Sequence, residues 1–200
     1  MTETSRIDAR RERTRQRLLD AGRALIAEKG VAGLRIQEIT AHADVALGSF
    51  YNYFPTKEDL VEAVVEESLE NLGAETVVDD AIQDPAITTS KAIRRVVGLA
   101  YGDPGFARLL LNLTHADALF ARSFHPFARQ VVERGIDRGR FSVPDIEAAV
   151  NLVVSSSLSL IRAILDGEHD EGVAEAHTEM CLIALGIVPS EARELSRVSL

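Results

Sequence analysis

The sequence predicts an all-α protein in which a three-helix N-terminal domain with a helix-turn-helix precedes a larger helical domain. Apolar residues recur three and four positions apart along most of the chain, which is the spacing of one helix face. The segments with this pattern stop at residues that end helices, such as Gly30, Pro55, Gly139 and Gly167. No stretch shows the sustained alternation of a strand. We expect about nine or ten helices, with domains at residues 1–56 and 57–200.

Composition and charge limit the classes of protein and of partner. The chain has 200 residues, 46% of them hydrophobic, and a net charge of -9. Residues 1–54 hold nine Lys/Arg and seven Asp/Glu, whereas the remainder holds thirteen and twenty-four. Phosphates would be repelled by the acidic remainder, so any nucleic acid should bind at the N-terminal end. The charged N-terminus lacks the apolar segment of a signal peptide, and no uninterrupted apolar run approaches the length of a membrane span, which favours a soluble, cytoplasmic protein.

The cysteine and histidine residues give no sign of a metal site or a disulfide. Cys181 is the single cysteine and is best explained as a buried core thiol. The histidines lack the spacing of metal ligands, and we expect no cofactor. They are His42, His115, His125, His169 and His177.

The first helix is predicted over residues 6–29, ended by Gly30. Its first half is rich in arginine, and two interpretations stay open. The arginines can form a solvated charged face, interleaved with Asp8 and Glu12, or they can contact a DNA backbone. They are Arg6, Arg10, Arg11, Arg13, Arg15 and Arg17.

Residues 35–54 predict the helix-turn-helix. A helix over 35–43 has one apolar stripe, a turn follows at 44–45, and a second helix covers 46–53. Phe50 and Phe54 are four residues apart and should face inward. The packing of these two side chains leaves the following residues facing outward: Leu47, Gly48, Ser49, Tyr51 and Asn52.

An outward face with tyrosines and a leucine favours a partner surface. Tyr, Asn and Ser side chains reach phosphates and base edges, so we interpret this helix as one that enters a DNA major groove. Two alternatives are a three-helix core with incidental surface aromatics and an adaptor that binds protein through Tyr51 and Tyr53.

The later elements follow from caps and stops. Pro55 ends the second helix, and Thr56 with Asp59 forms a capping pair for the next. Lys57 lies in the first turn of that helix against the helix dipole, where a phosphate oxygen would stabilise it. The helix at 144–165 is apolar on more than one face, which fits either packing against a second partner or deep burial in a monomer. The helices are predicted at 57–77, 88–100, 104–114, 116–138, 144–165 and 171–185, with a short terminal helix capped by Ser190.

Residues 18–65 resemble the DNA-binding domain of the TetR family of bacterial transcriptional repressors. The segment GSFYNYFPTKEDL, residues 48–60, is specific to that family in this order. The resemblance implies a homodimer that binds a palindromic double-stranded operator and is released by a small ligand; the residues do not distinguish a repressor from an activator. The matching residues are Ala24, Gly30, Ile39, Ala43, Val45, Gly48, Ser49, Phe50, Tyr51, Tyr53, Phe54, Lys57, Leu60 and Val64.

The resemblance also implies residue roles. Gln37 and residues 47–49 would contact base edges, and residues 51–53 with Lys57 would contact mainly the backbone. Three positions depart from the family pattern: Asp44 replaces Gly, Ala46 replaces Ser or Thr, and Leu47 replaces a polar residue. Ala46 cannot cap the recognition helix, which weakens a phosphate contact or moves the cap to Asp44. The predicted DNA-binding set is Arg35, Gln37, Leu47, Gly48, Ser49, Tyr51, Asn52, Tyr53 and Lys57.

The same resemblance places a ligand pocket in the larger domain and the dimer interface on the last two long helices. Large apolar residues near the middle of the domain are candidates for the wall of a pocket for a small apolar effector, although any single one of them is better explained as core. They are Phe106, Leu109, Leu110, Leu113, Phe120, Phe124 and Phe127. The chain has no nucleophile elbow, phosphate loop, metal-binding pair or dinucleotide fingerprint, so we expect no enzyme.

Overall fold

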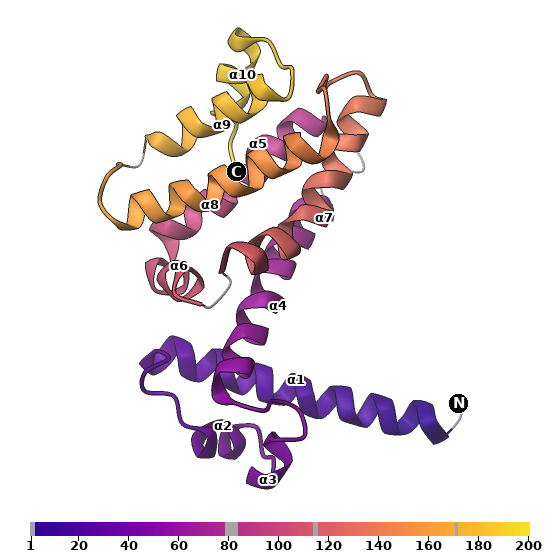
Figure 1. Ribbon diagram of the computed structural model, residues 1–200, viewed down its shortest axis with the longest axis vertical. Coiled ribbons are helices and arrows are strands. Elements are labelled where there is room, and N and C mark those ends of the chain that lie inside the picture. Colours follow the sequence, from indigo (N-terminus) through magenta and orange to yellow (C-terminus); the bar gives the residue numbers. More distant parts are fainter. Residues whose placement is uncertain (1–2, 79–83, 114–115, 171) are drawn as a thin grey trace. The chain divides into compact units, whose positions relative to one another are not determined.

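The computed structural model describes residues 3–78, 84–113, 116–170 and 172–200. Within these residues every regular element is a helix, which confirms the all-α prediction (Figure 1). The chain forms two compact units, residues 1–67 and 68–200. The helices are α1 (Glu3–Lys29), α2 (Ile36–His42), α3 (Leu47–Phe50), α4 (Lys57–Val78), α5 (Pro85–Gly102), α6 (Pro104–Leu111), α7 (Ala116–Asp137), α8 (Ile146–Leu165), α9 (Val173–Ala184) and α10 (Pro189–Leu195).

The first unit has one apolar core between α1, α2, α3 and the start of α4. Phe50 and Phe54 are 0% and 4% exposed, so both face inward as predicted. A Cβ atom on Gly22 would lie 2.6 Å from Leu60 Cδ2, so α1 and α4 approach closely there. Other fully or nearly fully buried side chains include Leu18, Leu19, Leu25, Leu34, Ile39, Leu60, Val61, Val64 and Val65.

Helix α4 begins at the capping pair predicted from the sequence. The Thr56 amide donates to Asp59 Oδ2 at 2.8 Å, and the Asp59 amide donates to Thr56 Oγ1 at 3.1 Å. This reciprocal arrangement satisfies two amides that the start of a helix leaves without partners.

Several helix boundaries differ from the predicted ones. α5 begins at Pro85 rather than Thr88, because the Asp84 carboxylate caps it by accepting from the Ala86 amide at 2.9 Å. α8 begins after Asp145, which accepts from the Ala148 amide at 2.8 Å. The N-cap of α10 is Val188, with the following proline in the first turn, so Ser190 does not cap it. The predicted helix over 46–53 shrinks to the four residues of α3, followed by a turn.

The second unit is arranged around α8, which packs against α5, α6, α7 and α9 (Figure 1). Its buried side includes Val150, Val154, Leu158 and Ile161. Among the described residues α8 is the one helix long and apolar enough to cross a membrane by length and composition. A central core helix meets the same criterion, and 44% of that stretch is buried inside the structure.

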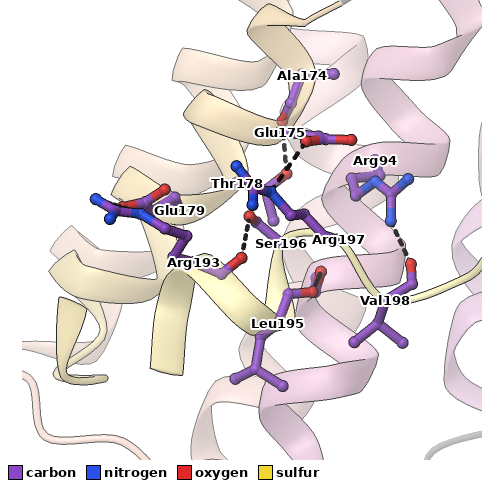
Figure 2. A network of polar contacts seen from close by, with 11 residues as sticks. Arg94, Ala174, Glu175, Thr178, Glu179, Arg193, Leu195, Ser196, Arg197 and Val198 are labelled. Carbon is purple, nitrogen blue, oxygen red and sulfur yellow. Dashed lines mark hydrogen bonds and ion pairs between the residues drawn. The ribbon is translucent and has the colours of Figure 1, made fainter. Parts of the chain in front are cut away.

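The C-terminal segment is held against α5 and α9 by polar contacts (Figure 2). Ser90 Oγ on α5 donates to the Leu195 carbonyl at 2.7 Å, and the Arg94 guanidinium donates to the Val198 carbonyl. An ion pair joins Arg197 to Glu175 of α9 at 3.5 Å. The carbonyls at the end of the chain therefore find donors on a helix about one hundred residues earlier.

A three-residue ion cluster joins the start of α5 to α10. The Arg140 guanidinium donates to Asp84 at 2.8–2.9 Å and to Glu191 at 2.7 Å. Burial alone would raise the pKa of Asp84, but the hydrogen bonds from Arg140 and from the Ala86 amide outweigh it and lower the pKa below 3.8. The hydrogen bonds that Arg140 donates to Asp84 and Glu191 raise the pKa of Arg140, so Asp84 and Arg140 both stay charged at neutral pH.

Gly135 on α7 is required by its contact with Phe141, and this gives a test of the packing. A Cβ atom there would lie 2.0 Å from Phe141 Cδ2, and Phe141 is 4% exposed. We expect Gly135→Ala to lower the free energy of unfolding by about 1–3 kcal/mol through overpacking. The measurement is urea denaturation followed by far-ultraviolet circular dichroism.

The matched control is Gly98→Ala on α5, where a Cβ atom would meet nothing within 4 Å. A helical alanine there should be neutral or stabilising by up to about 1 kcal/mol. Equal denaturation midpoints for both variants would contradict the close approach of α7 to Phe141.

Candidate functional site

The outward face of α3 carries the side chains that the sequence singled out. Leu47 is 44% exposed and Tyr51 is 56% exposed, although both are large and partly apolar. The Tyr51 ring touches the buried Phe50 ring edge-on, with centroids 5.5 Å apart. Asn52 is exposed and Ser49 is half-buried. No atom lies within 4 Å of the position where Gly48 would carry a Cβ, so a partner backbone can approach there.

A groove lies between the N-terminal half of α1 and the end of α3. Within the described residues, four of its twelve lining residues are arginines and one is an aspartate. The Arg11 guanidinium lies 6.0 Å from the Tyr53 ring centroid, a cation–π distance that holds the cation at the edge of the groove. The lining residues are Ala9, Arg10, Arg11, Arg13, Thr14, Arg17, Asp44, Val45, Ala46, Ser49, Asn52 and Tyr53.

This groove bears on the two interpretations of the α1 arginines. Arg10, Arg11 and Arg13 are exposed, and they share one concave surface with Ser49 and Asn52 of the recognition segment. A surface that combines arginines with neutral hydrogen-bonding groups suits a phosphate backbone. The arrangement favours the DNA-contact interpretation over a merely solvated face.

Asp44 occupies a backbone conformation that usually favours glycine. Its φ is 50°, in the left-handed region, where aspartate is tolerated better than most residues. Arg17 donates to the Asp44 carbonyl at 2.9 Å and to its carboxylate at 3.0 Å. The turn is therefore held to α1. The Asp44 carboxylate does not cap α3, whose N-cap residue Ala46 also makes no side-chain hydrogen bond.

The remaining predicted DNA-binding residues lie near the same face or on the adjacent helix ends. Arg35 is the exposed N-cap residue of α2, and Gln37 is exposed in its first turn. Lys57 is half-buried at the start of α4, with Nζ 3.8 Å from a Glu58 carboxylate oxygen. At that distance the pair is weak, so the ammonium can still bind another anion.

The second unit contains an apolar cavity of about 70 Å³ between α5, α7 and α8. Roughly 10–15 Å³ of such volume is enough for one water, so the cavity has room for a few water-sized groups. Three of the seven predicted pocket residues, Phe120, Phe124 and Phe127, line it. The other residues that line the cavity are Gly73, Thr89, Ala92, Ile93, Val96, Ala128, Val131, Val132, Val150, Val153, Val154, Ser157 and Leu185.

The other four predicted pocket residues belong to α6 or follow it. Phe106, Leu109, Leu110 and Leu113 do not line the cavity, and Leu110 is fully buried in the core. The lining residues that were not predicted are ordinary valines, an isoleucine and small residues, which look like any core. The run Thr88, Thr89 and Ser90 on α5 is buried, and of these three residues Thr89 lines the cavity.

A buried histidine lies behind the cavity. His177 Nε2 on α9 is 3.2 Å from Ser157 Oγ on α8 and 3.5 Å from Cys181 Sγ. Burial lowers the pKa of His177 below 6.5 and raises the pKa of Cys181 to about 11, so both side chains are neutral at pH 7. Cys181 is buried, as predicted. In the part of the chain that the structure describes, no group of three potential metal ligands comes together.

Comparison with known proteins gives two family matches that together span most of the chain. Residues 18–64 match the family described as bacterial regulatory proteins, tetR family. Residues 84–198 match the tetracyclin repressor-like C-terminal domain. The first match contains α3 and its flanking helices, and the second contains most of the residues that line the cavity.

Individual relatives agree with these matches. The chain is 34% identical over 73 residues to the HTH-type transcriptional repressor DhaR of Mycobacterium sp. (strain GP1). The aligned region covers 36% of each protein. The curated relatives matched first are thus aligned over about a third of their length. The HTH-type transcriptional regulator CymR of Pseudomonas putida is 29% identical over 154 residues, 73% of this chain and 68% of that protein. The crystal structure of RolR in complex with resorcinol superposes with a TM-score of 0.81 at 30% identity, covering 96% of this chain and 97% of RolR.

The buried histidine gives a pH dependence whose sign is set by its environment. Because burial lowers the pKa of His177, the unfolded chain takes up a proton near pH 6.5 that the folded chain does not. The free energy of unfolding should therefore be highest above pH 6.5 and should fall as the pH drops below it. We expect His177→Gln, which does not titrate, to show a shallower fall between pH 7.5 and pH 5.5 in thermal denaturation.

The control for this measurement is His169→Gln, since His169 is exposed. Its pH dependence should match that of the wild type. Parallel curves for the wild type and His177→Gln would show that His177 does not contribute to acid destabilisation.

Proposed function

Because the chain belongs to the TetR family of bacterial regulatory proteins, we propose that it is a sequence-specific DNA-binding transcriptional repressor released from a palindromic operator by a small apolar ligand. The family consists of transcriptional regulators rather than enzymes. The observation that carries the proposal is the exposed surface of α3 and of the turn after it: Tyr51 in this turn is 56% exposed, and Asn52 lines a groove together with four arginines.

In this proposal residues 1–56 form the DNA-binding domain, and α3 enters the major groove. Gln37 and residues 47–49 contact base edges, and Leu47 can pack on a thymine methyl but cannot hydrogen-bond a base. Arg35, residues 51–53 and Lys57 contact the backbone. The arginines of α1 also contact the DNA backbone in this proposal. The groove that they line together with residues of α3 and the turn after it supports this assignment.

Residues 57–200 form the ligand-binding and dimerisation domain. The cavity between α5, α7 and α8 is the proposed effector site, since its lining is almost wholly apolar. RolR, which has a similar fold over nearly its whole length, was crystallised with resorcinol. A compact, largely apolar effector for this chain fits the size of its cavity.

The proposed dimer interface is the exposed side of α8 and α9. Leu152 on α8 is 53% exposed, and Met180 and Ile183 on α9 are 60% and 39% exposed. The neighbouring exposed positions on the two helices are mostly alanine and serine, which permit close helix approach. A two-fold dimer through α8 and α9 would cover this face and would require inverted half-sites about one helical turn apart. Such a regulator acts in the cytoplasm.

Selection of bound duplexes from a random DNA pool tests the proposed function. A TetR-type dimer should recover an inverted repeat, and its binding should weaken steeply as salt increases, because phosphate contacts release counterions. Recovery of no enriched sequence, with no duplex bound at low salt, would rule the regulator out in favour of an adaptor that binds protein.

Tyr51→Ala tests the recognition face with the recovered duplex. We expect the variant to weaken binding by about tenfold or more in a gel-shift assay, because an exposed contact of α3 is lost. The melting temperature should change little, since Tyr51 is more than half exposed. Tyr51→Phe separates the hydroxyl from the ring. Unchanged affinity for Tyr51→Ala would remove this residue from the site.

Ile183→Glu combined with Met180→Glu tests the dimer. Placing two carboxylates on the exposed face of α9 should convert a particle of two 21.8 kDa chains into a monomer, because burying them would leave charges unpaired. Size-exclusion chromatography with light scattering measures the mass. The control is Val188→Glu, which is 58% exposed but lies beyond α9. A wild-type monomer at micromolar concentration would overturn the proposed interface.

A further inference from the structure

The turn between α2 and α3 places one carboxylate in an otherwise basic groove. The Asp44 side chain is 96% exposed, and it lines the groove between α1 and α3 together with four arginines. Among the described lining residues, Asp44 is the one that carries a negative charge. A phosphate backbone lying in this groove would be repelled by Asp44 unless a nearby cation balances its charge.

Arg17 on α1 is the cation that balances Asp44. Its Nη2 atom donates to the Asp44 carboxylate at 3.0 Å and to the Asp44 carbonyl at 2.9 Å. The first bond neutralises the carboxylate, and the second fixes the backbone of the turn. Both are charge-assisted hydrogen bonds, which are stronger than those between two neutral groups.

The turn needs this contact because α3 does not hold its own start. Asp44 has a φ of 50°, a conformation that is strained for a residue with a Cβ atom. The next residues lead directly into α3, whose N-cap residue Ala46 makes no side-chain hydrogen bond. The Val45 amide donates to the Thr40 carbonyl at 2.9 Å, which ties the turn to α2. The contact with Arg17 ties the turn to α1, so the start of α3 is positioned from both sides.

The other arginines of the groove lack a carboxylate partner. Arg10, Arg11 and Arg13 are exposed, and none of them forms an ion pair within the part of the chain that the structure describes. The Arg11 guanidinium lies over the Tyr53 ring instead. A phosphate can therefore contact these three arginines directly, whereas Arg17 acts through Asp44.

We propose that Arg17 is a positioning residue for DNA binding, which fixes the turn before α3 and neutralises the Asp44 carboxylate that would otherwise repel the phosphate backbone. Asp44 is then a built-in repulsive group that lowers operator affinity and makes this affinity depend on Arg17. The inference rests on the proposed function, in which the groove receives the backbone of an operator. It predicts that the effects of substituting Arg17 and Asp44 on DNA affinity are not additive.

A double-mutant cycle tests this by fluorescence anisotropy of the full chain with the duplex recovered by selection. Arg17→Gln should weaken binding by about tenfold in the wild-type background, because an unpaired carboxylate then faces the phosphates. In the Asp44→Gly background the same change should cost about threefold or less, since the carboxylate that Arg17 neutralises is absent. Asp44→Gly alone should strengthen binding by about threefold, because the repulsion is removed and glycine adopts the left-handed conformation freely.

Arg13→Gln is the matched control, because it removes the same charge from the same groove and Arg13 makes no ion pair with Asp44. It should weaken binding by an equal factor in both backgrounds. Asp44→Asn removes the charge but keeps the shape of the side chain, and it should strengthen binding as Asp44→Gly does. The gain from either Asp44 variant should shrink as salt rises from about 50 to 200 mM, because salt screens charge repulsion but not backbone strain. The melting temperature of Arg17→Gln should stay close to that of the wild type, since an exposed ion pair adds little stability.

Two results would overturn this inference alone, with wild-type protein that binds its duplex. The first is a cost of Arg17→Gln that is equal or larger in the Asp44→Gly background, since Arg17 would then be an ordinary phosphate contact or one that Asp44 withholds from DNA. The second is a gain from Asp44→Gly that Asp44→Asn lacks and that salt does not change, since backbone strain would then explain it. Wild-type protein that binds no duplex would overturn the inference together with the proposed function.

Discussion

The burial of Phe50 and Phe54 is the constraint on which the candidate DNA-binding face depends. α3 has only four residues, and its N-cap residue Ala46 makes no side-chain hydrogen bond, so it is far too short to be stable by itself. Its position comes from two phenylalanines that are almost fully removed from solvent. With those side chains directed into the core, the intervening residues must face outward. The exposed tyrosine and asparagine are thus a geometric result of core packing.

Much of the first unit could be predicted because its signals are local. The Thr56 and Asp59 capping pair and the inward phenylalanines lie within a few residues of what they determine. The same type of signal was overlooked at α5, where Asp84 and Pro85 start a helix in the same way as Asp103 and Pro104 start α6. The polar run before Asp84 made the segment look like a loop. The recognition helix was predicted too long because helical spacing continues through the turn after Phe50.

The cavity was less predictable, because a cavity is defined by what several distant helices leave unfilled. Phe120, Phe124 and Phe127 could be recognised, since they share one face of a single helix. The opposite wall comes from Val96 on α5 and Val153 on α8, which lie more than fifty residues apart and resemble any core valine. Phe106 and its neighbours have the same composition as a pocket wall but lie on α6, away from the cavity. Their position depends on the packing of α6, which no local pattern reveals.

The hydrogen bonds between α5 and the C-terminal segment have a practical consequence for how this protein is purified. Ser90 and Arg94 on α5 hold the carbonyls of Leu195 and Val198, and Arg140 holds the first turn of the same helix to Glu191. Thr89 lies between Asp84, which Arg140 contacts, and Ser90, which contacts Leu195. The C-terminal residues therefore stabilise the position of α5, which forms one wall of the cavity. Affinity tags or truncations at the carboxyl end would disturb these contacts directly and, through them, one wall of the cavity, without touching any lining residue. A tag at the amino end would instead crowd the arginines of α1, so a cleavable tag is the sound choice at either terminus.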